Sequence, residues 1–547
     1  MPICNQCNIG FDVYPKEKEF CARIGVPEPV VCRACRVRAL MATRNEWKLY
    51  RRKCDFTGDE IISAYPPDSP FKVYKNAVWW GNEWDASSYG RDFDFSRPFF
   101  AQFAELQKAV PREGTSVFSS ENCDYNSHLR ESKNCYLNSL VYQCEDLYYS
   151  YWMVHDKDVF DSMYTNESTL CFNCTSLNNG YGCVMVDESE NCSDCCFCYQ
   201  CRGCDHCLYC ANLANKSYHL FNKPCTKEEF EEAKKKALNG SWSRWNEAYG
   251  HYLDMRKKTV QRYVHNLNCE NVTGDHLYNC RNCENCYESF DSEEGVACVS
   301  LDHSKIVQNI YSAGWPGCEG VYQSCVTRGS KDIAFCTYTW FSGALRYCDG
   351  CNACTDCFGC IGLQHKKHCI LNKQYTKAEY EKMVAKIIAH MKKTDEWGKF
   401  FPSSLSLYAY NESAAMDFFP LEEKQAVKMG WQWRPKDKKE YMSAILKAIP
   451  DNISDVTDDI TKEILACERC GKNYKIIPQE LKFYRQTNLF IPRHCPDCRF
   501  RIRFDLRNPL RLFKRKCDKC QSEIQSSYAP GRPEKVYCEE CYLKEVY

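Results

Sequence analysis

The stretch from Cys192 to Cys210 reads Cys-Ser-Asp-Cys-Cys-Phe-Cys-Tyr-Gln-Cys-Arg-Gly-Cys-Asp-His-Cys-Leu-Tyr-Cys, with a cysteine at every third position. The same step of three extends from Cys123 to Leu213, and thirteen of the fourteen cysteines in this span fall in its phase. Asp156 is the one charged residue in the phase. A helix repeats every 3.6 residues and a strand every two, so a step of three indicates neither.

A period of twelve residues lies over the step of three. Asn122, Asn134, Asp146 and Asp158 occupy the same point of successive repeats and are turn-forming residues. The apolar residues that follow them continue at this interval: Cys123, Cys135, Leu147, Val159, Cys171, Cys183, Cys195 and Cys207. This pattern predicts a narrow coil that points one side chain inward on each of four short sides, with coils stacked about 4.8 Å apart. The predicted structure is a parallel β-solenoid, right-handed because parallel crossovers nearly always are.

A second copy of the repeat follows 150 residues later. Cys198, Cys201, Cys204, Cys207 and Cys210 recur there as Cys348, Cys351, Cys354, Cys357 and Cys360. Its phase slips once, at residues 313–317, which predicts an inserted loop. Each copy closes with Thr-Lys-x-Glu, at residues 226–229 and 376–379. This motif predicts a capping box and a helix that covers the open end of the coil.

The two ends of the chain repeat each other at an offset of 463 residues. Each copy contains Cys-x2-Cys, 24 residues, and Cys-x2-Cys. Two such knuckles supply four thiolates in a tetrahedron, which is a typical zinc site. The second knuckle leads into a segment without Pro or Gly, as in a treble clef. The predicted ligands are Cys4, Cys7, Cys32 and Cys35 at one end and Cys467, Cys470, Cys495 and Cys498 at the other.

The C-terminal copy carries a further set, Cys517, Cys520, Cys538 and Cys541. Its N-terminal counterparts are Cys54, Thr57, Lys75 and Val78, so only one ligand remains there. We therefore expect three structural Zn²⁺ ions, one in the N-terminal copy and two in the C-terminal copy. The aromatic residues after Lys75, including Trp79, Trp80 and Trp84, predict an apolar core in place of the missing metal.

The central cysteines admit two interpretations. No secretion signal or run of about 18 apolar residues is present, which predicts a cytoplasmic protein with reduced thiols and no membrane span. Reduced cysteine is the right size for a thin core and packs as a small hydrophobe, the interpretation that we favour. Alternatively, four inward thiolates could hold zinc or an iron–sulfur cluster. The candidate cages are Cys198, Cys201, Cys204 and Cys207, and Cys348, Cys351, Cys354 and Cys357.

Basic residues gather beside the zinc knuckles, although Lys and Arg (72) balance Asp and Glu (72) overall. Such segments are typical of proteins that bind phosphate backbones. The leading hypothesis is a non-enzymatic zinc scaffold that binds RNA, DNA or a ribonucleoprotein. Its predicted phosphate contacts are Arg36, Arg38, Arg51, Arg52, Arg499, Arg501, Arg503, Arg515 and Lys516. Two alternatives are a protein–protein scaffold, in which the basic helices pack on acidic neighbours, and a redox protein using the central cages. The twelve histidines are scattered, and no nucleophile–base pair or phosphate loop indicates an enzyme.

Four stretches carry a resemblance to known proteins: Cys32–Arg36, Tyr89–Pro98, Asn372–Lys377 and Val536–Tyr547. Through them the chain resembles a family of large uncharacterised zinc-ribbon proteins from uncultivated, small-genome bacteria. The resemblance covers nearly the whole chain. It implies zinc binding at the terminal knuckles and brings neither a reaction nor a partner.

The predicted fold is mainly β with flanking α: a central two-copy parallel β-solenoid with helical caps between zinc-ribbon or treble-clef modules. The predicted segments are 1–115, a zinc module with an aromatic second half; 116–225 and 269–375, the two solenoid copies; 226–268 and 376–463, caps and connectors; and 464–547, a double zinc module.

Overall fold

The computed structural model describes residues 1–296, 298–302, 304–308, 311–313, 318–435 and 448–546. The chain divides into two compact units. Unit 1 contains Met1–Thr115, Val264–Pro435 and Pro509–Leu512, and unit 2 contains Ser116–Tyr263, Lys436–Asn508 and Phe513–Tyr547. Unit 1 thus combines the N-terminal cysteine module with the second repeat copy, and unit 2 combines the first copy with the C-terminal cysteine module.

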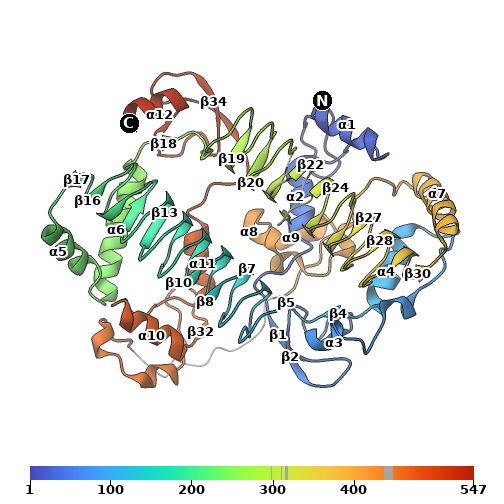
Figure 1. Ribbon diagram of the computed structural model, residues 1–547, viewed down its shortest axis with the longest axis horizontal. Helices are drawn as coiled ribbons and strands as arrows, with labels where there is room; N and C mark the ends of the chain where they lie inside the picture. The colour runs from blue at the N-terminus through green and yellow to red at the C-terminus, as the bar shows by residue number, and fades with distance from the viewer. Residues whose placement is uncertain (297, 303, 309–310, 314–317, 436–447, 547) are drawn as a thin grey trace. The chain divides into compact units, whose positions relative to one another are not determined.

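The first repeat copy is a stack of short parallel strands, which appear as successive rungs from β5 to β16 (Figure 1). Residues pair with partners twelve positions along the chain, as in Ser139 with Tyr151 and Tyr151 with Met163. We call this the first stack. Its strands are β5 (Ser116–Phe118), β6 (His128–Arg130), β7 (Ser139–Tyr142), β8 (Glu145–Tyr148), β9 (Tyr151–Val154), β10 (Lys157–Phe160), β11 (Met163–Asn166), β12 (Thr175–Asn178), β13 (Val184–Glu190), β14 (Cys196–Tyr199), β15 (Asp205–Leu208), β16 (Ser217–Leu220) and the antiparallel β17 (Lys223–Pro224).

The step of three in the sequence corresponds to a backbone corner with positive φ at nearly every third residue. The turn residues Asn122, Asn134, Asp146 and Asp158 all have φ between 50° and 56°. Positive φ recurs at nearly every third residue through the stack, so the chain turns a corner after each short side. Asn, Asp and Gly tolerate this conformation best. The residues that follow each corner, from Cys192 to Cys210 in steps of three, are at most 1% exposed.

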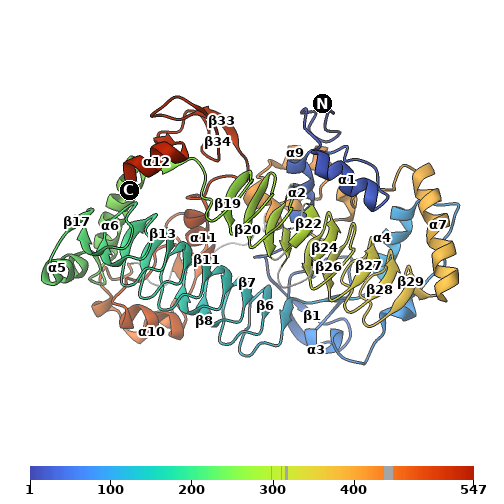
Figure 2. The ribbon, with the colours of Figure 1, turned by 45° about the horizontal axis from the view of Figure 1, so that its top comes forward.

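The second stack lies in unit 1 and is visible as the rungs from β19 to β29 (Figure 2). Its pairing steps are eleven residues at the start, as in Leu267 with Tyr278, and then twelve on both sides of the predicted insertion, as in Gly274 with Cys286 and Gly343 with Thr355. Across the predicted insertion the step is fourteen, as in Tyr311 with Cys325; residues 314–317 themselves lie outside the described part. The strands are β19 (Gly274–Tyr278), β20 (Cys286–Phe290), β21 (Val299–Asp302), β22 (Ser304–Gln308), β23 (Tyr311–Ala313), β24 (Cys318–Tyr322), β25 (Cys325–Arg328), β26 (Thr337–Trp340), β27 (Gly343–Arg346), β28 (Thr355–Phe358), β29 (Lys367–Ile370) and β30 (Lys373–Gln374).

A capped helix follows each stack, as the Thr-Lys-x-Glu motifs predict. Helix α5 (Lys227–Ala237) begins where the Thr226 hydroxyl accepts from the Glu229 amide at 3.1 Å, and the Glu229 carboxylate accepts from the Thr226 amide at 2.8 Å. The same capping box begins α7 (Lys377–Lys393) at Thr376. Helix α6 (Trp242–Lys258) then packs on the first stack, with the Trp245 ring 5.5 Å from Phe172.

The two terminal cysteine modules match each other element by element at the offset of 463. Helices α1 (Pro15–Arg23) and α2 (Arg33–Met41) correspond to α10 (Pro478–Gln486) and α11 (Pro496–Phe504). Hairpin β1 (Tyr50–Lys53) with β2 (Glu60–Ser63) corresponds to β33 (Phe513–Lys516) with β34 (Glu523–Ser526). The modules end in β3 (Val73–Tyr74) with α3 (Asn76–Trp79), and in β35 (Val536–Tyr537) with α12 (Glu539–Val546).

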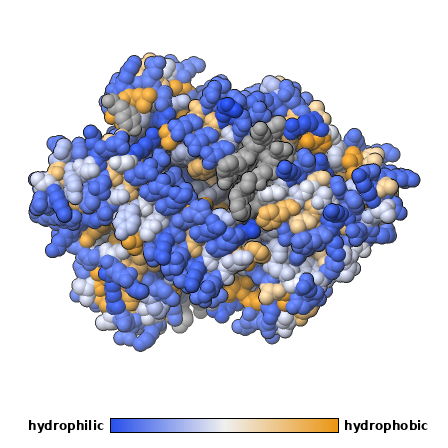
Figure 3. Space-filling model, in the orientation of Figure 1, coloured by the Kyte–Doolittle hydropathy of each residue, from blue (hydrophilic) through white to orange (hydrophobic). Residues whose placement is uncertain are grey.

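Shorter elements complete the described chain. They are η1 (Ala86–Tyr89), α4 (Phe99–Ala109), β4 (Arg112–Glu113), β18 (Gln261–Arg262), η2 (Ser403–Leu405), η3 (Tyr410–Glu412), α8 (Ala414–Phe418), α9 (Glu423–Lys428), η4 (Ile453–Asp455), η5 (Asp458–Thr461), β31 (Leu465–Ala466) and β32 (Asn473–Tyr474). Among the helices of the described residues, none has the length and apolar character needed to cross a membrane. The face in Figure 3 is mainly hydrophilic, with hydrophobic residues in small separate groups.

Candidate metal centres

All twelve predicted zinc ligands gather into three clusters of four cysteines. The Sγ atoms of each cluster lie within 4.8 Å of one another. The Sγ–Sγ distance is 3.7 Å in each of the pairs Cys7–Cys32, Cys470–Cys495 and Cys520–Cys538. Four sulfurs placed 2.3 Å from a tetrahedral zinc are about 3.8 Å apart. The thiols therefore fit one ion per cluster.

Local structure explains how the first cysteine cluster of each terminal module forms. The turn from Cys4 to Asn8 closes with a bond from the Asn8 amide to the Cys4 carbonyl at 2.9 Å. Cys32 is the N-cap of α2, and its backbone amide donates to Cys4 Sγ at 3.3 Å. Such N–H···S contacts favour the thiolate form that binds metal. Cys495 begins α11 in the same way.

The fourth, incomplete set has a polar bridge in place of a metal. Lys75 Nζ lies 2.6 Å from Asp59 Oδ2, and the Thr57 hydroxyl donates to the same oxygen at 2.9 Å. Cys54 keeps its place, because the Lys75 amide donates to its Sγ at 3.3 Å. The predicted aromatic core is present beside it, since Tyr74, Val78 and Trp79 form a buried cluster with Cys54. Trp80 and Trp84 pack against this cluster.

The central cysteines have different surroundings. Cys198 Sγ lies 3.3 Å from the Cys196 carbonyl and 3.4 Å from the Cys207 carbonyl. The same two contacts recur at Cys201, Cys204, Cys348 and Cys354. Each Sγ lies near the carbonyl two residues earlier and near the carbonyl nine residues later. Among the described residues, the clusters of three or more ligand atoms within 4.8 Å do not include these thiols. The contacts favour packing with weak S–H···O bonds, and the cage stays the alternative.

Several of the predicted phosphate contacts are buried in ion pairs, which corrects our expectation for them. Arg499 Nε and Arg503 Nη1 lie 3.1 and 3.2 Å from Asp161 Oδ1 of the first stack. Arg499 also pairs with Glu480 at 3.2 Å, and Arg36 pairs with Glu17 at 2.6 Å. All three arginine side chains are at most 8% exposed. They hold the modules together and are not available to phosphate.

Two more of the predicted contacts, Arg52 and Arg515, are also largely buried, with side chains 6% and 9% exposed, and each pairs with an aspartate at 2.9 Å. Arg38 and Arg501 are more exposed: Arg38 Nη2 donates to Cys35 Sγ at 3.2 Å, and Arg501 lies 3.8 Å from Asp505. Arg51 and Lys516 are exposed on β1 and β33.

An aromatic column of the first stack is covered by the C-terminal module. Tyr148 and Phe160 stack at 4.4 Å, and Phe160 stacks on Phe483 of α10 at 3.7 Å. Phe172 contacts Tyr484 at 6.2 Å and is 3% exposed. The column is therefore core and offers no open platform for bases.

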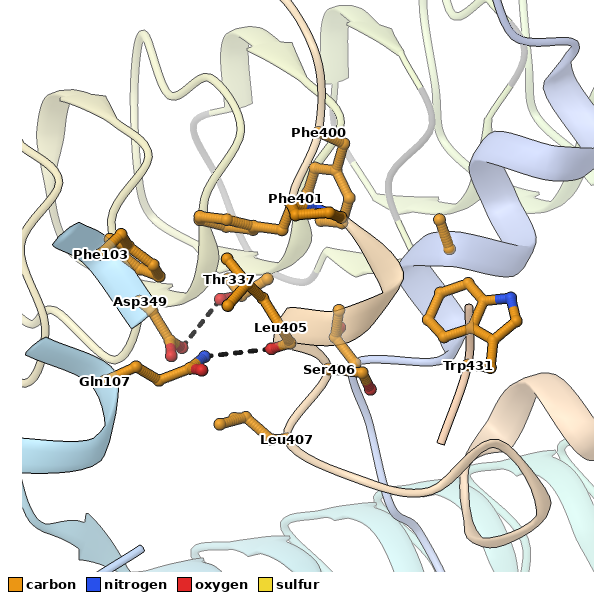
Figure 4. A pocket seen from close by; sticks show the side chains of 13 residues that line it. Phe103, Gln107, Thr337, Asp349, Phe400, Phe401, Leu405, Ser406, Leu407 and Trp431 are labelled. Carbon is orange, nitrogen blue, oxygen red and sulfur yellow. Dashed lines mark hydrogen bonds between the residues drawn. The ribbon is translucent and has the colours of Figure 1, made fainter. Parts of the chain in front are cut away.

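Unit 1 contains a small cavity between α4, the second stack and residues 400–407 (Figure 4). Thr337 donates to Asp349 Oδ1 at 2.8 Å, and Gln107 donates to the Leu405 carbonyl at 3.2 Å. Arg112 Nη1 lies 2.5 Å from Asp349 Oδ2, so the carboxylate is already paired. The cavity volume of about 20 Å³ is room for one water and not for a substrate.

Two further groups of metal-ligand residues escaped the sequence argument. Asp194, Asp205 and His206 bring ligand atoms within 4.8 Å of one another on the first stack. Lys234 Nζ lies 3.4 Å from Asp194 there, so a cation already faces this group. His265 and His276 bring ring nitrogens within 4.8 Å of each other in unit 1. Their spacing of eleven residues belongs to the shortened first coil, which the period of twelve does not reveal.

Comparison with known proteins gives no relative to guide these assignments. No protein-family model, curated protein or solved structure matches the chain. The resemblance to zinc-ribbon proteins therefore contributes nothing beyond the cysteine clusters themselves.

Proposed function

We propose that the protein is a non-enzymatic, zinc-stabilised scaffold whose two stacks are β-solenoids that present their outer sides to partner proteins. Three tetrahedral Cys4 clusters in small modules support a structural role for the metal, because all four positions of each ion are filled by thiolates. A catalytic zinc keeps one position open for water or substrate.

One observation favours a protein partner over nucleic acid: Arg499 and Arg503 of α11 are buried in ion pairs within the protein. Arg499 and Arg503 join α11 to Asp161 of the first stack, and Glu480 of α10 completes the network. Burial raises the pKa of Glu480, and the Arg499 guanidinium opposes that rise. A buried pair of this kind holds elements in register, because removing one partner costs about 3–5 kcal/mol. Helix α11 thus fastens the C-terminal module to the first stack.

A direct experiment compares the partners of the full chain before and after nuclease treatment. The proposal predicts a defined set of bound proteins that survives nuclease and moderate salt. Loss of every partner on nuclease treatment would remove the protein–protein role.

Nucleic-acid binding stays a second candidate because Lys514 and Lys516 of β33 are exposed on the same hairpin face. If this hairpin contacts phosphates, the Lys514→Glu/Lys516→Glu double variant should bind RNA and DNA more weakly than the wild type. The slope of log K against log salt should also fall by about two. An unchanged slope would exclude this surface.

A further inference from the structure

The start of the second stack contains a buried group of two histidines and two carboxylates. His265, His276 and Glu288 follow one another on successive coils, eleven and then twelve residues apart. Asp275 lies beside them at the start of β19. The side chains of His265, Asp275, His276 and Glu288 are 10%, 2%, 7% and 8% exposed.

Backbone geometry brings these side chains together. Gly274 has φ of 137°, and a Cβ atom there would lie 1.7 Å from the Cys286 carbonyl, so only glycine permits this approach of adjacent coils. Asp275 Oδ1 accepts from the amides of His265 at 2.6 Å and His276 at 3.0 Å. The carboxylate therefore has a fixed position beside the two rings, which stack on each other with centroids 4.7 Å apart.

Three separations between ligand atoms are close to those expected around a shared ion. His265 Nδ1 and His276 Nδ1 lie 3.2 and 3.5 Å from Asp275 Oδ1, and His276 Nδ1 lies 3.9 Å from Glu288 Oε1. Nitrogen and oxygen ligands about 2.0–2.1 Å from a tetrahedral zinc are about 3.3 Å apart. The second oxygen of Asp275, Oδ2, is buried and has no hydrogen-bond partner.

Charge points the same way. Burial of the Asp275 and Glu288 carboxylates is unfavourable unless charge compensates them, and both contact imidazole nitrogens. One divalent ion would compensate the carboxylates and accept lone pairs from both imidazoles.

We infer that His265, Asp275, His276 and Glu288 form a site for one divalent transition-metal ion such as Zn²⁺, separate from the three cysteine clusters. The donor set of two imidazoles and two carboxylates is one that zinc accepts in proteins. This site is independent of the scaffold function and of the Cys4 ligands.

The test counts metal in the full chain after loading with Zn²⁺ and removal of excess ion. The His265→Ala/His276→Ala variant should contain one ion fewer than the wild type. The control His219→Ala should match the wild type, because the His219 ring contacts only the neighbouring Ser217 carbonyl in the contacts that the structure gives it. Equal zinc content in wild type and double variant would overturn the inference.

Cobalt loading keeps the test decisive if the double variant folds poorly. Wild-type protein in which Co²⁺ occupies every metal site should contain four ions, and only three of them should contribute thiolate-to-cobalt charge-transfer absorbance, because the ligands of the fourth are nitrogen and oxygen. A total of three ions, or charge-transfer absorbance that matches four thiolate sites, would contradict the inference.

Discussion

The second halves of the two terminal cysteine modules share a backbone and differ in what stabilises it. In both, an arginine pairs with an aspartate three residues on at 2.9 Å, Arg52 with Asp55 and Arg515 with Asp518. In both, the same aspartate accepts from a valine amide at 2.7 Å. The C-terminal copy then closes around four thiols, whereas the N-terminal copy closes with the Lys75–Asp59 ion pair and a tryptophan core.

This difference indicates that the same backbone can be stabilised either by a metal ion or by burial of apolar side chains. A structural zinc contributes about 10–16 kcal/mol of apparent binding free energy in small modules. Burying one tryptophan contributes a few kcal/mol, so several aromatic residues are needed for the exchange. The predictions below separate the two mechanisms.

Removing zinc with a chelator should have the largest effect on local stability. Of the two second halves, only the C-terminal one should lose its structure. Hydrogen exchange should rise strongly in residues 513–546, because the second C-terminal cluster loses its ion. Residues 50–79 should stay protected. Equal loss of protection in both segments would contradict the comparison.

Trp79→Ala should destabilise the N-terminal module by about 3–5 kcal/mol, because it empties a fully packed site. Trp79 is 3% exposed, and its Nε1 donates to the Pro111 carbonyl at 3.3 Å. The matched variant Tyr542→Ala, at the equivalent C-terminal position, should lose less while zinc is bound. Thermal unfolding of the two variants measures the difference, and an equal or reversed order would break the comparison.

Restoring the missing ligands should restore the metal. The triple variant Thr57→Cys/Lys75→Cys/Val78→Cys completes the set with Cys54 and should bind one additional Zn²⁺ per chain. The control Thr57→Ser/Lys75→Ser/Val78→Ser has similar volumes without thiolates and should bind none. Unchanged zinc content in the cysteine variant would show that the two backbones differ more than their hydrogen bonds indicate.

Asp59→Asn should have the smallest effect. The ion pair with Lys75 lies at the surface, where water and salt screen it. We therefore expect a slight fall in melting temperature that disappears at high salt. A large, salt-independent fall would mean that the polar bridge, and not the aromatic core, replaces the metal.

The sequence predicted the features that depend on short spacings. The twelve Cys4 ligands follow from Cys-x2-Cys pairs, and the capping boxes at Thr226 and Thr376 follow from four consecutive residues. The corner positions followed from Asn and Asp at a fixed interval, because these residues tolerate positive φ.

Features that depend on distant partners were not predictable. From the sequence alone, Arg503 has the pattern of a solvent-exposed basic residue. Its partner in the structure, Asp161, lies 342 positions earlier in the chain. His265 and His276 meet because one coil is a residue shorter than the period. A basic helix next to a cysteine knuckle therefore indicates that its arginines bind negative charge. The sequence does not show whether that charge belongs to the same chain or to another molecule.

The most direct test of the account compares the zinc content of two equivalent variants, Cys54→Ser and Cys517→Ser. Both cysteines are at most 2% exposed, and both accept a backbone N–H at 3.3 Å on Sγ. The account predicts that Cys517→Ser loses one Zn²⁺ per chain and that Cys54→Ser has the wild-type content. Loss of one ion from Cys54→Ser, or of none from Cys517→Ser, would contradict it.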